Sequence, residues 1–210
     1  MRKTISSVLV VAIMLTTGCF GSVKTQEIVL DSQTPRNLII GVTEANIDVS
    51  ESSTSIYKDY KNDIYRTLMS ESHGLIGVAN DQPLRLFVTF RYKLDNSQWG
   101  IGQALLAMGS VFFFPLAFVT NSNTQEYSVN YVIKDLDNNV IYQQGFTDKV
   151  EGTYAGWYFF RGDGYAKFLK KAAEFSGKNA ALHVIKSIKE NSATIAAAAK
   201  NAPGMSARVP

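Results

Sequence analysis

TQEYSVNYVIKDLDNNVIYQQGFTD, residues 124–148, is the stretch that decides the fold. Over residues 127–133, large side chains alternate with smaller and polar ones, which is the period-two pattern of a strand with one buried face. Residues 135–139 have the composition of a turn, and residues 140–146 return as a second strand. The stretch therefore predicts a β-hairpin.

Four further segments complete a domain that we expect over residues 37–191. Residues 37–42 form a short apolar run and residues 84–91 alternate with period two, so both predict strands. Residues 56–72 and 165–188 repeat their apolar side chains every three or four positions, as amphipathic helices do. Two helices on one face of a small, largely antiparallel sheet would bury these apolar faces, so we predict an α+β fold.

The connecting segments carry weaker signals. Residues 43–55 are polar and residues 151–164 are rich in glycine and aromatic residues, so we expect loops in both places. Gly177 interrupts the second helix and predicts either a kink or close packing. From residue 192 the chain is alanine-rich and then irregular, so residues 192–210 are predicted to form a frayed tail.

Composition excludes several classes of protein. The chain has 210 residues, 46% hydrophobic and 19% charged, which fits one folded domain and not a disordered chain. Basic and acidic residues nearly balance once residues 1–18 are set aside, so we expect no nucleic-acid partner. One cysteine excludes an internal disulfide, and with two histidines it cannot supply a four-ligand zinc site. We predict no metal and no cofactor.

Residues 1–19, MRKTISSVLVVAIMLTTGC, have the order of an export signal. Arg2 and Lys3 come first, an apolar run over residues 8–15 follows, and small residues lead to Cys19. The apolar run is too short for a stable spanning helix. We therefore predict that residues 1–18 are a signal peptide, with a buried N-terminal helix or strand as the alternative.

Gly18 followed by Cys19 resembles the lipobox of bacterial lipoproteins, with Thr16 where leucine is usual. The resemblance implies that Cys19 begins the mature chain and carries a diacylglyceryl group and an N-acyl chain such as palmitate. Several acyl chains give stable membrane anchoring. Phe20 stands where aspartate would signal retention in the inner membrane, which favours the outer membrane. Residues 19–36 are then predicted to be a lipidated tether.

Residues 101–119, IGQALLAMGSVFFFPLAFV, carry no charge. As a helix this run would be about 28 Å long, close to the hydrocarbon thickness of a bilayer. Three interpretations stay open: a membrane-inserted element, an element lying on the bilayer surface, or a buried or oligomeric contact. Among inserted forms we prefer a dipping hairpin, because a single crossing would split the predicted sheet. The expected membrane-contact residues are Trp99, Ile101, Leu105, Leu106, Phe112, Phe113, Phe114, Leu116 and Phe118.

Signals for catalysis are missing from the sequence: it contains no GxSxG, HExxH, P-loop or GxGxxG motif. His73 and His183 are isolated, and we expect each to be on the surface or hydrogen-bonded within the protein. Asp59 and Asp63 predict a solvated helix face better than an acid–base pair. Residues 135, 137 and 139 alternate like calcium ligands but fit a turn better. We predict that the protein is not an enzyme.

An aromatic cluster is the remaining candidate site. It is a possible ligand or partner contact, with packing in a core or an interface as the alternative. Its members are Trp157, Tyr158, Phe159 and Phe160.

The mature chain resembles small uncharacterised envelope lipoproteins of Gram-negative bacteria, in which a hairpin with a VxDxxG-like turn follows an apolar segment containing proline. Here these features are residues 132–138 and Pro115. A looser resemblance is to α+β export-ring lipoproteins of the curli-secretion type. We therefore predict a non-enzymatic lipoprotein, anchored to a membrane of the cell envelope and facing the periplasm, that contacts another envelope protein or itself. The alternatives are an oligomeric export or assembly component and a lipid- or small-ligand-binding module.

Overall fold

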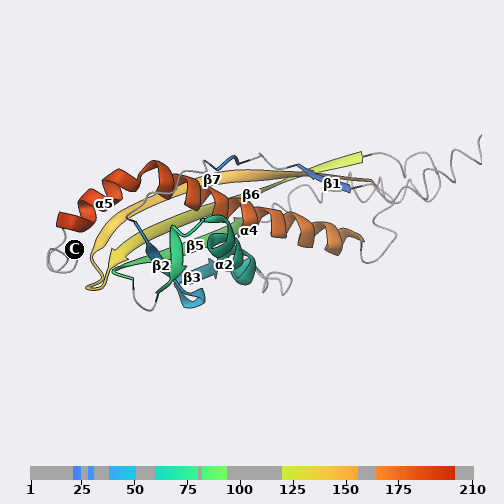
Figure 1. The fold of residues 1–210 in the computed structure, drawn as a ribbon. Coiled ribbons are helices and arrows are strands. Elements are labelled where there is room, and N and C mark those ends of the chain that lie inside the picture. Colours follow the sequence, from blue (N-terminus) through green and yellow to red (C-terminus); the bar gives the residue numbers. More distant parts are fainter. Residues whose placement is uncertain are drawn as a thin grey trace, which may run out of the picture.

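The computed structural model describes residues 21–24, 28–30, 38–50, 60–79, 82–93, 120–155 and 164–201. In these residues seven strands form one sheet, which is covered by helices (Figure 1). The strand order is β1-β7-β6-β5-β2-β4, and β3 also pairs with β5. This arrangement confirms the predicted α+β fold. The elements are β1 (Gly21–Lys24), β2 (Ile40–Val42), the 3-10 helix η1 (Glu44–Asn46), β3 (Ile47–Ser50), α2 (Tyr60–Glu71), β4 (Ile76–Val78), β5 (Leu84–Lys93), β6 (Thr120–Asp135), β7 (Val140–Ala155), α4 (Gly164–Glu190) and α5 (Ser192–Asn201).

The β6–β7 hairpin is the longest part of the sheet and confirms the hairpin expected over residues 124–148. Each of its strands has 16 residues. At about 3.3 Å per residue, such a hairpin is about 50 Å long. β5 lies antiparallel to β6 along its whole length, from Leu84 opposite Asp135 to Lys93 opposite Glu126. The three long strands therefore pair antiparallel, as predicted.

The side chain of Asp135 holds the turn of this hairpin. Its Oδ1 accepts hydrogen bonds from the backbone N–H groups of Asp137 (2.9 Å) and Asn139 (2.8 Å), and its Oδ2 accepts one from Nδ2 of Asn139 (2.9 Å). These bonds, chiefly the one from the Asn139 side chain, lower the pKa of Asp135. Asn138 has a φ of 64°, a left-handed conformation that asparagine tolerates. The interpretation of these residues as a turn is confirmed.

Two short parallel strands share the outer edge of β5. β2 meets it at Gly41 opposite Arg85, and β3 pairs with residues 88–91 of β5. β4 adds to β2, also in parallel. The loop predicted over residues 43–55 is therefore wrong for residues 44–50, which form η1 and β3. A Cβ at Gly41 would lie 2.6 Å from Cα of Ala79, so glycine is required for this close approach.

Helices α2 and α4 pack against each other and against one face of the sheet, as predicted. Alternate side chains of β5 and β6 point into this layer and are buried, while those between them are exposed or half-buried. Gly177 of α4 is buried, and a Cβ there would lie 3.4 Å from Tyr60 and 3.6 Å from Ile64 of α2. Gly177 thus faces α2, and an added Cβ would make ordinary van der Waals contacts there. The largest fully buried side chains are Tyr127, Tyr131, Phe90, Ile40, Ile47, Ile64, Leu68, Leu75, Leu86, Ile133 and Ile185.

Three boundary predictions need correction. The tail predicted to be irregular from residue 192 is helical over Ser192–Asn201, because Ile195 and Ala199, four residues apart, are buried on one side of α5. The tether predicted over residues 19–36 contains β1, which pairs with β7. The loop predicted over residues 151–164 is wrong for residues 151–155, which belong to β7, and for Gly164, where α4 begins.

Candidate functional site

Three chain segments leave the described fold at the same end of the sheet, which we call the sheet base. The sheet base is formed by Gly21 of β1, Thr120 of β6 and the last two residues of β7. Gly21 and Asn121 both pair with Tyr154, and Thr120 pairs with Ala155. In Figure 1, β1 lies at the end of the hairpin remote from its turn.

β5 also ends on the side of the sheet that faces the base. Its last residue, Lys93, lies opposite Glu126 of β6. Because β5 and β6 are antiparallel neighbours, the segment 94–119 leaves the sheet and returns to it on the same side. A single bilayer crossing between Lys93 and Thr120 would separate two strands that pair over ten residues.

All the residues predicted from sequence to contact membrane, ligand or partner lie outside the described residues. Among the helices that the structure describes, none is both long and apolar enough to cross a membrane. The described parts of the chain also contain no group of three or more potential metal ligands. Asp59 lies outside the described residues, so its pairing with Asp63 is not described. The predicted contact residues concerned are Cys19, Trp99, Ile101, Leu105, Leu106, Phe112, Phe113, Phe114, Leu116, Phe118, Trp157, Tyr158, Phe159 and Phe160.

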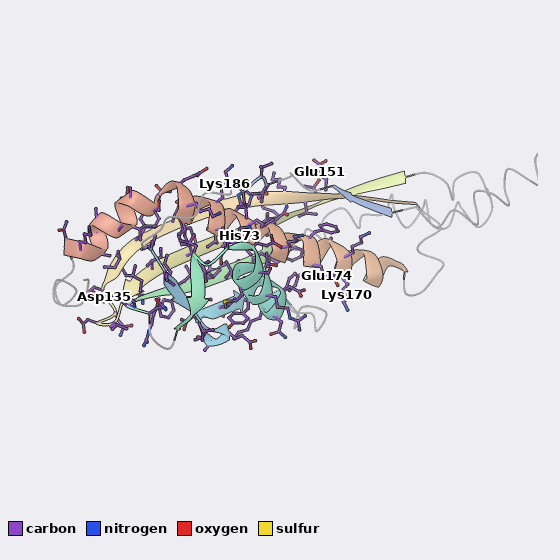
Figure 2. The ribbon with its side chains drawn as sticks, in the orientation of Figure 1. His73, Asp135, Glu151, Lys170, Glu174 and Lys186 are labelled. Carbon is purple, nitrogen blue, oxygen red and sulfur yellow. The ribbon has the colours of Figure 1, made fainter. Side chains whose placement is uncertain are left out.

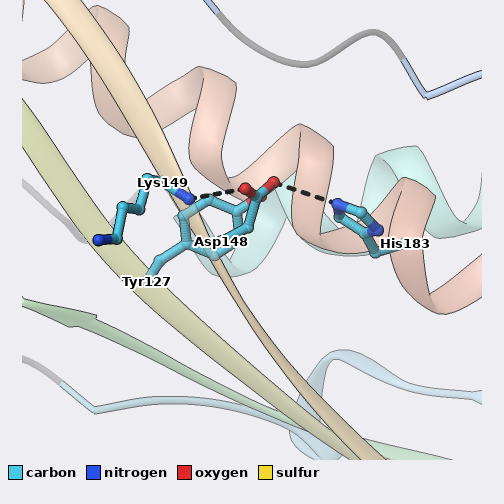
Figure 3. Close-up of polar contacts among 4 residues, drawn as sticks. All are labelled: Tyr127, Asp148, Lys149 and His183. Atoms are coloured by element: carbon cyan, nitrogen blue, oxygen red, sulfur yellow. Dashed lines mark hydrogen bonds and ion pairs between the residues drawn. The ribbon is translucent and has the colours of Figure 1, made fainter.

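Polar side chains join α4 to the inner face of the hairpin, in a group that we call the polar seam. Its first half is centred on Asp148 (Figure 3). Oδ2 of Asp148 accepts a hydrogen bond from the hydroxyl of Tyr127 (3.0 Å) and lies 3.2 Å from Nε2 of His183. Oδ1 accepts a hydrogen bond from the backbone N–H of Lys149 (2.7 Å). The members of the seam are Tyr127, Tyr131, Gln144, Asp148, His183 and Ser187.

The second half of the seam lies one helical turn further along α4. Oγ of Ser187 donates to Oε1 of Gln144 (2.5 Å) and lies 2.7 Å from the hydroxyl of Tyr131. Between the two halves, the ring of Phe146 packs on that of His183, with 4.7 Å between ring centres. The seam therefore connects three elements, β6, β7 and α4, through side-chain contacts.

Burial disfavours ionisation of the two tyrosines of the seam. It raises the pKa of both Tyr127 and Tyr131, and the nearby Asp148 carboxylate adds to the rise for Tyr127. A tyrosine held neutral donates a hydrogen bond but is no nucleophile near neutral pH. The seam is therefore chemically suited to join the helix to the sheet.

Sequence reasoning did not find the polar seam, because only the spacing within each element was visible and not the pairing between elements. His183 and Ser187 are four residues apart on a helix, and Gln144 and Asp148 are on one face of a strand. His183 confirms the expectation of a histidine hydrogen-bonded within the protein. His73 lies in the exposed turn after α2 with a φ of 52°, and Figure 2 shows its position.

Comparison with known proteins assigns no family. No protein-family model matches the chain, and no curated protein matches it. Among solved structures, the chain is similar to a minor lipoprotein from Acinetobacter baumannii, with 12% identity, a TM-score of 0.43, and coverage of 73% of this chain and 92% of that one. It is also similar to a structure presented as a neuraminyllactose-binding hemagglutinin homolog from Helicobacter pylori, with 10% identity, a TM-score of 0.44, and coverage of 83% and 97%.

Proposed function

We propose that the protein is a non-enzymatic lipoprotein of the bacterial cell envelope, anchored through Cys19 and facing the periplasm, whose α+β domain binds another envelope protein. One observation carries the proposal: three apolar features of the sequence adjoin the sheet base. β1 begins two residues after Cys19, and β6 begins directly after the uncharged run 101–119. β7 ends two residues before Trp157.

Attachment at several points on one end would orient a domain on a bilayer, as a single flexible link does not. Acyl chains on Cys19 would supply the stable anchor. A run of apolar residues that leaves and re-enters the sheet on one side is compatible with a hairpin that dips into the bilayer. Aromatic side chains such as Trp157 are enriched at the level of lipid headgroups. We therefore assign the aromatic cluster to the membrane interface in this proposal, in preference to a ligand site.

Catalysis is not part of the proposal. Asp148 of the polar seam contacts His183 of α4 and accepts a hydrogen bond from Tyr127 within the hairpin. We favour the outer membrane because Phe20 stands where an inner-membrane signal would carry aspartate.

Mass spectrometry of the membrane-bound protein tests the anchor. We expect an N-terminal peptide that begins at Cys19 and carries the mass of a diacylglyceryl group and an N-acyl chain. The Cys19→Ala variant should lose this mass and become extractable from membranes once Phe113→Ser and Phe114→Ser weaken the second attachment. An unmodified thiol at Cys19, in a chain that retains residues 1–18, would overturn the proposal.

The mass of the detergent-solubilised protein separates the main function from its runner-up. A monomer, or a complex with a different envelope protein, supports the proposed role. A closed ring of identical subunits would favour an oligomeric export component instead.

A further inference from the structure

We infer that β1 is a strap that, together with the proposed second attachment through residues 101–119, fixes the domain upright on the membrane, with the sheet base at the bilayer and the hairpin turn pointing away from it. This inference rests on the proposed lipidation of Cys19. It also depends on the pairing of β1 with the end of β7 and on the contacts that join α4 to the hairpin.

The first step is the position of β1. Its four residues pair antiparallel with β7, from Gly21 opposite Tyr154 to Lys24 opposite Glu151. Phe20 alone separates Cys19 from Gly21. A fully extended chain spans at most about 3.6 Å per residue, so the link from Gly21 back to Cys19 can reach at most about 7 Å from the sheet base.

The second step compares this distance with that of a free tether. If residues 20–36 were a flexible chain, their mean end-to-end distance would be about 23 Å, and the domain could lie in any orientation. Pairing of β1 shortens this tether, because the lipidated residue then adjoins the end of a paired strand, and with the second attachment through residues 101–119 it limits the orientations that the domain can take. The acyl chains therefore enter the bilayer next to the sheet base.

The third step is the attachment of α4 to the hairpin. α4 contacts β1, β6 and β7, and the polar seam bonds α4 to the middle of the hairpin at Asp148 and Gln144. Figure 2 shows Glu151 near β1 and Asp135 at the opposite end of the hairpin. With the base at the bilayer, the hairpin turn would stand about 50 Å above the membrane surface. The turn and α5 then face the periplasm, where another envelope protein can reach them.

Height measurements on vesicles of phosphatidylethanolamine and phosphatidylglycerol test the strap. A fluorophore on Asp137→Cys marks the exposed turn, and lipidation of Cys19 leaves this as the free thiol. Val23→Pro removes a backbone N–H from β1 and should release the strap. Val29→Pro is the matched control, because Val29 is exposed and lies outside the strands. All variants keep residues 101–119 unchanged, so that the parent is held at two points and release of the strap leaves only a flexible link beside the second attachment.

Energy transfer from the fluorophore to acceptor lipids gives the height of the turn. We expect a narrow distribution near 50 Å for the parent and for Val29→Pro, and a lower, broad distribution for Val23→Pro. A cross-strand disulfide between Ser22→Cys and Thr153→Cys, which are paired in register, should restore the narrow distribution in the Val23→Pro chain. Equal distributions for Val23→Pro and its control, or a broad distribution in the parent, would overturn the strap.

The acyl mass on Cys19 is measured on the same samples. If that mass is absent, the anchor fails, and the strap is tested by whether the Ser22→Cys and Thr153→Cys pair still forms its disulfide in the folded chain. If the mass is present and the heights are equal, the strap fails while the proposed anchor stands. If the Ser22→Cys and Thr153→Cys pair forms no disulfide, whether or not Cys19 carries the acyl mass, the strap is also contradicted.

Discussion

Replacing Ser187 with alanine removes the hydroxyl that joins α4 to both strands of the hairpin. Ser187 is 8% exposed, and its Oγ lies 2.7 Å from the hydroxyl of the fully buried Tyr131. Leaving a buried polar group without its partner costs about 1–3 kcal/mol. Tyr131 keeps a longer contact of 3.3 Å to Oε1 of Gln144, so we expect the lower part of that range, about 1–2 kcal/mol.

The matched control is Ser70→Ala in α2. Ser70 is also a helical serine, but it is exposed, and its Oγ makes only a local 3.5 Å contact with the carbonyl of Thr67. Both substitutions gain the same helix propensity, so the difference between their changes in the free energy of unfolding reports the contacts of Ser187 in the polar seam. We expect Ser70→Ala to change the free energy of unfolding by less than about 0.5 kcal/mol.

Urea unfolding, followed by circular dichroism at 222 nm on the Cys19→Ser chain in detergent, measures both variants. Adding Tyr131→Phe to Ser187→Ala should recover part of the loss, because the buried hydroxyl that lost its partner is gone. A double-mutant cycle with a coupling energy of about 1 kcal/mol is the expected result. If Ser187→Ala and Ser70→Ala have the same midpoint, or the cycle shows no coupling, the energetic role given to the polar seam is wrong.

Three further predictions concern the fold. Gly177→Ala should stabilise the protein by up to about 1 kcal/mol, since a Cβ there meets ordinary contacts, whereas Gly41→Ala should destabilise it; thermal unfolding gives both signs. Asp135→Asn should lower the urea midpoint near neutral pH, and the difference from wild type should shrink as pH falls below about 4, because the lowered pKa stabilises the fold only while the carboxylate is ionised. Absorbance at 295 nm should show that Tyr127 and Tyr131 stay protonated above pH 10 in the folded chain. Because their pKa values are raised on folding, the free energy of unfolding should fall as the pH rises through the unfolded pKa of about 10. Full ionisation of both tyrosines before unfolding would contradict their burial.

The hairpin and the two main helices could be predicted because each has a long, regular pattern. Residues 127–133 alternate over several positions, and α4 repeats its apolar residues over many turns. The turn was also predictable, since the side chains of Asp135 and Asn139 act within five residues of each other. In these elements, local sequence and tertiary packing favour the same structure.

The missed elements are short and depend on distant partners. β1 is Gly-Ser-Val-Lys, which has no apolar face of its own and is a strand only because residues 151–154 offer it an edge. β3 likewise forms against residues 88–91 of β5. The contact between His183 and Asp148 joins residues 35 positions apart, so no local sequence pattern predicts it. Pairing partners of this kind are set by register and not by composition.

The register of β5 against β6 distinguishes two ways in which the apolar run 101–119 could insert, a single crossing and a hairpin. Hydropathy alone does not distinguish them. The strongly apolar residues of the run favour insertion by roughly 3–6 kcal/mol on a translocon scale, and its glycines, proline and polar residues oppose it. A single crossing would forfeit the β5–β6 pairing, and each large apolar side chain exposed by that loss costs about 1.5–3 kcal/mol. The buried side chains of β5 and β6 that separation of the two strands would expose include Leu86, Val88, Phe90, Val129, Tyr131 and Ile133. Six such residues cost at least about 9 kcal/mol, more than the run returns, so a single crossing is disfavoured and the proposed anchoring has the run enter and leave the bilayer from one side.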